Sequence, residues 1–144
     1  MIYLLDVNVL IALADPQHIN HQVAHAWFDR EGVSGFATCP IIENGLLRII
    51  GSSRYDHPIR SPGEAVPFLR SMTALPGHQF WADDLSLARS SIVTIDRIRT
   101  PGQVTDAYLL ALAVSKGGRL ATLDRRLSPD AVAGGKKALH LIAP

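Results

Sequence analysis

Two short apolar segments of this 144-residue chain each end at an aspartate. Residues 1–5 read Met-Ile-Tyr-Leu-Leu and stop at Asp6, and a second apolar segment within residues 119–123 stops at Asp124. Both segments predict short buried strands. A charged residue directly after such a strand lies at the carboxyl edge of the sheet, where ligands bind in open α/β sheets. The alternative is that each aspartate only caps the next helix, which is less favourable when two strands end alike.

Predicted strands and helices alternate along the chain. We expect further strands over residues 35–39, 79–82 and 138–142, and helices over residues 7–14, 18–31, 41–50, 62–75 and 104–115. Residues 52–62 are expected to form an exposed connection. Strands that alternate with helices predict an α/β fold with a mostly parallel sheet. The length fits one domain spanning residues 1–144.

The composition restricts the class of protein. With 47% hydrophobic residues and a net charge of +1, the chain is not expected to be disordered. No apolar run approaches the roughly 20 residues of a membrane span, and no signal peptide is evident. The single cysteine, Cys39, cannot form an internal disulfide and excludes a cysteine zinc site. We therefore expect a soluble domain of a reducing compartment, in the cytoplasm.

Two further acids, Glu43 and Asp106, lie inside apolar helical patterns. Each is near the first turn of its predicted helix, where the helix dipole favours a carboxylate, so good helix placement is the simpler interpretation. An acid among core-facing residues nevertheless carries a desolvation cost unless a cation compensates it. Both acids are therefore candidates to join Asp6 and Asp124 at a common site.

Four converging carboxylates would raise one another's pKa and titrate as a coupled set. A divalent cation relieves this repulsion, and oxygen ligands select Mg²⁺ or Mn²⁺ over zinc. Such an ion lowers the pKa of a bound water and neutralises charge on a phosphoryl transition state. The chemistry that this pattern indicates is metal-assisted hydrolysis of a phosphodiester.

Four short motifs around these acids resemble those of the PIN-domain family, most closely the VapC-type toxins of bacterial toxin–antitoxin pairs. They are, in order, residues 5–11 (LDVNVLI), 40–48 (PIIENGLLR), 105–107 (TDA) and 122–124 (TLD). Each motif is weak alone, but all four in this order and spacing are specific, and the match covers essentially the whole chain.

The resemblance implies a PIN-like three-layer sandwich, with a central parallel sheet flanked by helices. It implies an Mg²⁺- or Mn²⁺-dependent endoribonuclease that acts on RNA such as tRNA or rRNA. It further implies a VapB-type antitoxin as partner and a homodimer. The residues that carry over as catalytic metal ligands are Asp6, Glu43, Asp106 and Asp124, and those that carry over as hydrogen-bonding support are Asn8, Thr105 and Thr122.

The charge distribution is consistent with an RNA substrate. The four acids contribute −4, so the rest of the chain carries +5. Arg48, Arg125 and Arg126 follow the second and fourth motifs closely and are candidates to contact phosphates. A solvated basic helix face is an equally good interpretation of each, and Arg48 is also a candidate to receive an antitoxin carboxylate.

Two other functions remain open alongside the nuclease. An aspartyl-phosphate phosphatase would also place an aspartate after the first strand, but it would normally have a second acid where this chain has Asn8. A non-catalytic module that binds RNA or an antitoxin would need none of the four acids. A receiver-type signalling domain fits poorly, because Asp56 lies in a polar connection.

Several other features are expected to be structural. His18, His21 and His25 are spaced for zinc along a predicted helix, but an exposed helix face is the favoured interpretation. Trp81 is a candidate to stack on a base, although a place in the core or a dimer interface is favoured. Cys39 is expected to be a small buried residue. Residues 134–137, Gly-Gly-Lys-Lys, are expected to form a turn.

Overall fold

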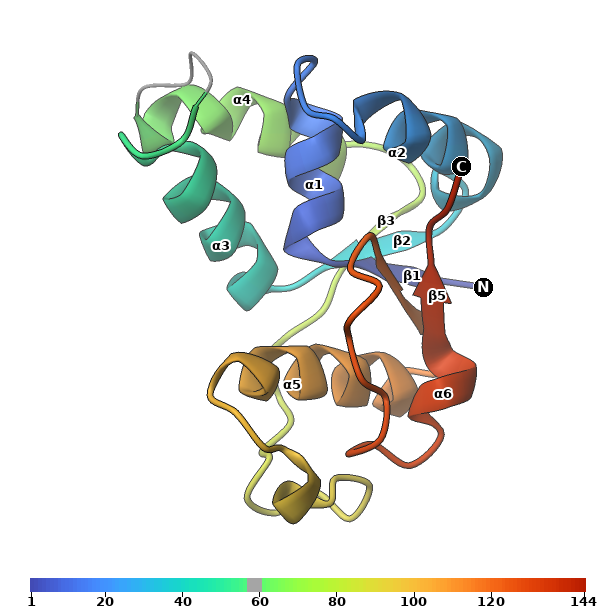
Figure 1. Cartoon of the computed structure of the whole chain (residues 1–144). Helices are drawn as coiled ribbons and strands as arrows, with labels where there is room; N and C mark the ends of the chain where they lie inside the picture. The colour runs from blue at the N-terminus through green and yellow to red at the C-terminus, as the bar shows by residue number, and fades with distance from the viewer. Residues whose placement is uncertain (57–60) are drawn as a thin grey trace.

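Five parallel strands form one central sheet in the part of the chain that the structure describes, residues 1–56 and 61–144 (Figure 1). In the computed structural model the strand order is β3-β2-β1-β4-β5. The strands are β1 (Tyr3–Leu5), β2 (Phe36–Thr38), β3 (His78–Phe80), β4 (Arg119–Thr122) and β5 (Leu139–Leu141). Every pairing between them is parallel, so their carboxyl ends share one edge of the sheet.

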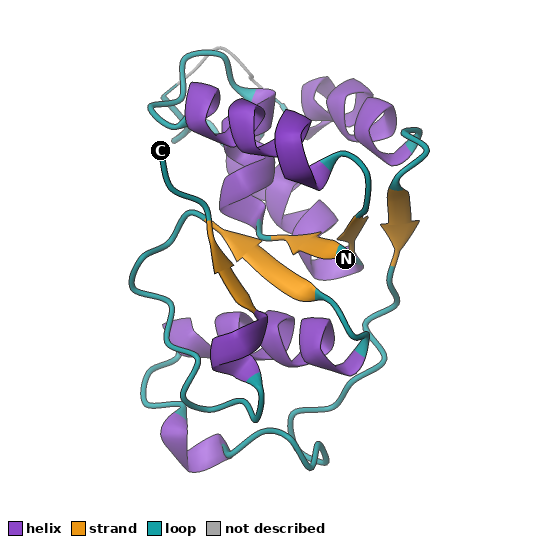
Figure 2. Cartoon of the chain, turned by 90° about the vertical axis from the view of Figure 1, so that its right-hand side faces the viewer, coloured by secondary structure: helices purple, strands orange, loops and turns teal. Residues whose placement is uncertain are grey.

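Helices cover both faces of this sheet, as Figure 2 shows. One face carries α1 (Val7–Ala14), α2 (His21–Trp27), α3 (Pro40–Ile50) and α4 (Pro62–Thr73). The other face carries α5 (Gly102–Ser115) and the short α6 (Gly135–Ala138). The expected α/β architecture, a three-layer sandwich with a parallel sheet, is therefore confirmed.

The central strands are buried because helices pack on both of their faces. Leu4 and Leu5 of β1 and Leu120 and Ala121 of β4 have no exposed surface. Strands covered on both sides are expected to be continuously apolar rather than alternating. The edge strand β3 is different, since it carries polar residues and is largely exposed. Only the central strands therefore bring the apolar segments seen in the sequence deep into the core.

Helix α5 is buried on nearly all sides. Residues 107–113 are all buried, as expected of a helix that is apolar all round. The helix lies between the sheet and a segment around the short helix η2 (Ile95–Arg97) (Figure 1). It ends at Gly117, whose φ of 72° glycine adopts at little cost, and the Gly118 amide donates to the Ala113 carbonyl at 2.9 Å. The helix predicted over residues 104–115 is confirmed, and it begins two residues earlier than predicted.

Two predicted elements differ from the structure. The helix expected over residues 18–31 begins only at His21, because His18 and Asn20 belong to a hydrogen-bonded turn after α1. After α2 the chain widens into a π-helical turn, η1 (Phe28–Gly32), in which the Val33 amide donates to the Phe28 carbonyl at 2.8 Å. The turn expected at residues 134–137 is wrong, since residues from Gly135 form α6 after Gly134 reverses the chain with a φ of 75°.

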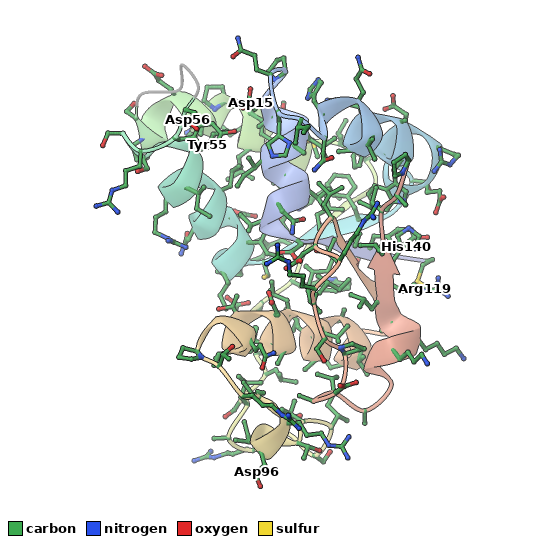
Figure 3. All side chains as sticks on the ribbon, in the orientation of Figure 1. Asp15, Tyr55, Asp56, Asp96, Arg119 and His140 are labelled. Carbon is green, nitrogen blue, oxygen red and sulfur yellow. The ribbon has the colours of Figure 1, made fainter. Side chains whose placement is uncertain are left out.

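The expected exposed connection over residues 52–62 is described only in part, because residues 57–60 lie outside the described residues. Its described portion is not simply solvated. The Tyr55 hydroxyl donates to a carboxylate oxygen of Asp15, which caps the end of α1, and Figure 3 shows the two side chains side by side. This contact ties the start of the connection to the helical layer.

Within the described residues, no helix is both long and apolar enough to cross a membrane.

Candidate active site

Asp6 lies where β1 passes into α1, and it is 5% exposed. Its carboxylate oxygen Oδ1 accepts the Val7 amide at 2.7 Å, so Asp6 does cap the helix, which the sequence left open as the alternative to a ligand role. Its own amide donates to the Ala121 carbonyl of β4 at 2.9 Å. The second carboxylate oxygen, Oδ2, is not used by the cap, and it faces the end of β4.

Thr122 and Asn8 hold that second oxygen in place. The hydroxyl of Thr122, which has no exposed surface, donates to Asp6 Oδ2 at 2.8 Å. The Asn8 amide nitrogen lies 3.3 Å from the same oxygen and 3.1 Å from Thr122 Oγ1, while its oxygen accepts the Leu123 amide at 3.0 Å. This network fixes the carboxylate of Asp6 against the end of β4. The supporting role of Asn8 and Thr122 at a metal site stays a prediction, and these hydrogen bonds are compatible with it.

Asp106 and Asp124 lie close enough to Asp6 for their charges to interact. Burial, followed by the charges of Asp6 and Asp124, raises the pKa of Asp106 to about 6. Burial also raises the pKa of Asp6, with the charge of Asp124 adding to it and the hydrogen bonds from Thr122 and Val7 opposing it. Asp124 itself is exposed and accepts the Arg126 amide at 2.9 Å. The three aspartates, from β1, α5 and the end of β4, therefore form one electrostatic cluster.

Glu43 occupies a separate environment at the start of α3. Its Oε2 accepts the Thr38 hydroxyl at 2.6 Å, and Thr38 Oγ1 lies 2.7 Å from His78 Nε2. Because the single Thr38 proton goes to Glu43, the imidazole donates to the hydroxyl. Burial lowers the pKa of His78, and the Glu43 charge opposes that shift. The hydrogen bonds of Glu43 therefore lead toward β2 and β3 rather than to the three aspartates.

The donor set suits a hard cation by its chemistry. All four predicted ligands are carboxylates, and the mutual repulsion of the aspartates is what a divalent ion relieves. Across residues 1–56 and 61–144, no three His, Cys, Asp or Glu side chains are arranged as a group that could hold a metal ion. Mg²⁺ is commonly held by only one or two carboxylates together with waters, so a cluster of this kind fits it without a complete protein cage.

The other predicted contact residues are exposed. Thr105 lies on the first turn of α5, Arg48 on the last turn of α3, and Arg125 and Arg126 just beyond Asp124. Of the arginines, Arg126 lies beside Asp106 along a small cavity. Thr105 makes no side-chain hydrogen bond to any residue that the structure describes.

The histidine-rich segment has a structural role. His21 Nδ1 lies 2.7 Å from the Ala12 carbonyl and His25 Nε2 lies 3.2 Å from the Leu13 carbonyl, both in the last turn of α1. Carbonyls at a helix end lack partners within the helix, so these rings complete the end of α1. The expectation of an exposed helix face was wrong because both rings turn inward. Trp81 and Cys39 are buried in the core, as predicted.

Sequence reasoning missed Thr38 and His78. Thr38 ends β2 and His78 begins β3, and the two come together only because these strands pair in parallel. The apolar pattern of residues 35–39 predicted the strand, but nothing in it marked Thr38. A threonine at the carboxyl end of a strand, as at Thr122, is the signal that could have found it.

Comparison with known proteins defines the class. The PIN domain matches residues 3–131, and the chain therefore belongs to the PIN-domain family. It is 43% identical over 134 residues to Ribonuclease VapC44 of Mycobacterium tuberculosis, covering 93% of this chain and 94% of that protein. The same identity over 134 residues holds for Ribonuclease VapC39 of that organism, covering 93% and 96%. Ribonuclease VapC38 is 40% identical over 121 residues, 84% of each chain. The family resemblance seen in the sequence is confirmed.

Proposed function

We propose that this protein is a divalent-metal-dependent endoribonuclease toxin. In this proposal residues 1–144 act as one nuclease domain in the cytoplasm, on structured RNA such as tRNA or rRNA. A VapB-type antitoxin neutralises the enzyme, and two copies form a homodimer. The names of the relatives, each called a ribonuclease, support the activity.

One observation carries the proposal. Asp6, Asp106 and Asp124 come from three elements far apart in the sequence, yet their charges meet at the carboxyl edge of the sheet. Burial, followed by the charges of Asp6 and Asp124, raises the pKa of Asp106 to about 6, so ionising this carboxyl group beside the other two is unfavourable. Such charge is costly for a fold and is useful when a cation binds there.

The residues that would hold the cation are Asp6, Asp106 and Asp124, and Glu43 remains a further candidate ligand from the start of α3. When bound, the ion would activate a water and stabilise negative charge on the phosphoryl group. The chain itself supplies orientation. Thr122 and Asn8 fix the carboxylate of Asp6, and Thr38 fixes that of Glu43, so neither has to be ordered during the reaction.

The surroundings of Asn8 speak against the phosphatase alternative. That chemistry would use a second acid two residues after the first to move a proton. Here both ends of the Asn8 amide are engaged, with the Leu123 amide on one side and with Asp6 and Thr122 on the other. The position therefore serves to join the ends of β1 and β4.

Cleavage of RNA by the purified protein tests the function directly. Total cellular RNA is incubated with Mg²⁺, Mn²⁺ or a chelator, and fragment ends are sequenced. We expect discrete fragments that require the metal. Asp6→Asn should lower the cleavage rate by more than the roughly 10–100-fold that loss of an outer hydrogen-bonding partner costs, because it removes a proposed ligand.

The exposed Asp29 of η1 provides the matched control. Asp29→Asn removes the same charge elsewhere and should cleave at the parental rate. Equal cleavage by Asp6→Asn and the parent would show that Asp6 is not a ligand. A parent that binds RNA but never cuts it, under any metal, would instead support the non-catalytic binding module.

A further inference from the structure

An arginine-lined cleft leads outward from Asp106, between η2, the start of α5 and the loop after β4. Its inner end is a cavity of about 30 Å³ beside Asp106, Gln103 and Arg126, with room for about one water. Its outer part, of about 360 Å³, is lined by Arg97, Arg99, Gln103, Ser128 and Asp130. Arg97, Gln103 and Ser128 line both parts. The two cavities therefore adjoin each other, and we call them together the arginine cleft.

The guanidinium groups of this cleft are available for an anion. Arg97, Arg99 and Arg126 form no ion pair with any residue in the ranges 1–56 and 61–144. Arg97 Nη1 donates to the main-chain carbonyl of Asp130 at 3.2 Å, and Asp130 lines the same cavity without forming an ion pair with Arg97 among the described residues. Asp96, on the same short helix, points outward from the molecule in Figure 3. Each guanidinium offers a planar set of donors that suits phosphate.

The segment that carries Arg97 and Arg99 is fastened to the loop after β4. The Thr94 amide donates to the Ala131 carbonyl at 2.8 Å, and the Ala133 amide donates to the Ile92 carbonyl at 2.7 Å. At the other end of the segment, the Arg99 amide donates to Gln103 Oε1 at 2.8 Å. The backbone that carries Arg97 and Arg99 is thus fixed before any ligand arrives, which lowers the entropic cost of binding.

We propose that the arginine cleft binds backbone phosphates of the RNA on one side of the bond to be cut, with Arg97 and Arg99 as the principal contacts. This inference rests on the proposed ribonuclease function. An RNA strand carries a phosphate at every nucleotide, so a strand whose reacting phosphate lies at the aspartate cluster presents its next phosphates to neighbouring surfaces. Asp106 lines the inner end of the cleft together with Arg97 and Arg126, so the cleft is such a neighbouring surface.

The chemistry of the lining favours RNA over an acidic partner peptide. The outer part is bordered by arginine, glutamine, serine and aspartate side chains, with no apolar pocket to anchor a peptide. An apolar hollow does lie on the far side of Arg99, lined by Leu87, Ile95, Ile98, Thr100, Pro101 and Val104. We expect a peptide to bind in that hollow. The polar and charged lining of the arginine cleft suits a strongly charged, hydrophilic RNA strand better.

Salt-dependent binding of RNA tests the inference. The probe is a fluorescently labelled, single-stranded RNA of mixed sequence, bound in chelator so that it is not cut. The double variant Arg97→Gln/Arg99→Gln is compared with Arg30→Gln/Arg70→Gln, which removes the same charge from exposed positions in η1 and α4. We expect weaker binding by the cleft variant only, with the slope of log affinity against log salt reduced by about 1.4 for two lost phosphate contacts.

Cleavage kinetics with Mn²⁺ separate this inference from the function itself. The cleft variant should raise KM and leave kcat close to the parental value, because it loses binding away from the reacting phosphate. If it binds RNA with the parental affinity and salt slope while the parent still cleaves, the cleft does not hold RNA and an acidic partner is its better occupant. If the parent neither binds nor cleaves RNA, the proposed function and the inference both fail.

Discussion

The two halves of the candidate site hold their carboxylates in different ways. In the half formed by β1, β4 and α5, Asp6 receives its hydrogen bonds from uncharged groups, and two further aspartates lie nearby. In the half formed by β2, β3 and α3, Glu43 is linked through Thr38 to the imidazole of His78. In the first half the carboxylate oxygens of Asp6 are ordered by uncharged donors only. The second half includes the His78 imidazole, which can take up a proton.

This difference predicts which half would respond more strongly to a cation. Neutral donors orient a carboxylate but leave its charge in place, so three neighbouring aspartates repel one another. At Glu43 the carboxylate accepts the Thr38 hydroxyl, which also contacts His78, and the Glu43 charge only partly opposes the lowering of the His78 pKa by burial. The aspartate half should therefore respond strongly to metal and to pH, and the Glu43 half only weakly.

The largest effect expected is stabilisation by Mn²⁺ through the aspartate half. Mass action predicts a gain of about 2.7 kcal/mol in the free energy of unfolding at a concentration 100 times the Kd. Asp106→Asn should lose most of this gain, whereas Thr38→Val should keep it. Thermal melting of each variant with and without Mn²⁺ measures the effect. An unchanged melting temperature of the parent at saturating Mn²⁺ would argue against a ligand cluster.

The two buried threonines provide a matched test of the comparison. Thr122→Val should destabilise the fold by about 1–3 kcal/mol, because the buried Asp6 oxygen then loses a donor that water cannot replace. Thr38→Val should cost less, since Glu43 is partly exposed and can be hydrated. Denaturant unfolding of the two variants gives the values. A larger loss of unfolding free energy for Thr38→Val than for Thr122→Val would contradict this comparison. It would mean that the Glu43 half depends more on its threonine than the aspartate half does.

Asp106 should make the metal-free protein less stable as the pH rises. Its pKa is about 6 in the fold, against an ordinary value of 3.8, so the folded state keeps the proton longer than the unfolded state. This contribution is fully present below pH 3.8 and is lost as the pH rises through about 6. After allowance for solvent screening we expect about 1–2 kcal/mol. The stability profile of Asp106→Asn should lack this fall, and an identical profile would contradict the shift.

We expect His78 to have the smallest effect on the pH dependence of stability, and in the direction opposite to that of Asp106. Its pKa is lowered in the fold, so its contribution is present above its ordinary value of 6.5 and is lost as the pH falls through the folded value. His78→Gln, which can still donate to Thr38, should reduce this acid sensitivity and change the stability at pH 8 by less than about 1 kcal/mol. Chemical unfolding at pH 5 and pH 8 provides the measurement. A loss at pH 8 as large as that at pH 5 would mean that His78 acts only through packing.

The sequence predicted one half of the site better than the other. Asp6 and Asp124 stand out because each ends an apolar strand in the centre of the sheet, where burial makes the hydrophobic pattern continuous. The contact between Thr38 and His78 depends on the pairing of β2 with the exposed edge strand β3, whose sequence is polar and short. Side chains brought together only by such pairing leave no periodic signal.

Segments without regular structure explain the other differences. Arg97 and Arg99 lie in and just after one turn of helix, where no hydrophobic period marks a face. The inward turn of His21 and His25 depends on unsatisfied carbonyls at the end of another helix. Both features follow from the tertiary arrangement of the chain, so they could be recognised only after the fold was known.

The pairing of β1 with β4 affects the stage of synthesis at which the protein can fold. Leu4 lies beside Leu120 in the sheet, and the Thr122 hydroxyl reaches Asp6 across 116 positions of the chain. Contacts this distant in sequence form late, after the nearer ones. A growing chain therefore carries Asp6 and Glu43 long before it carries Thr122 and Asp124. The aspartate cluster cannot be complete until most of the polypeptide has been made, so under the proposed function an unfinished chain on the ribosome would lack nuclease activity.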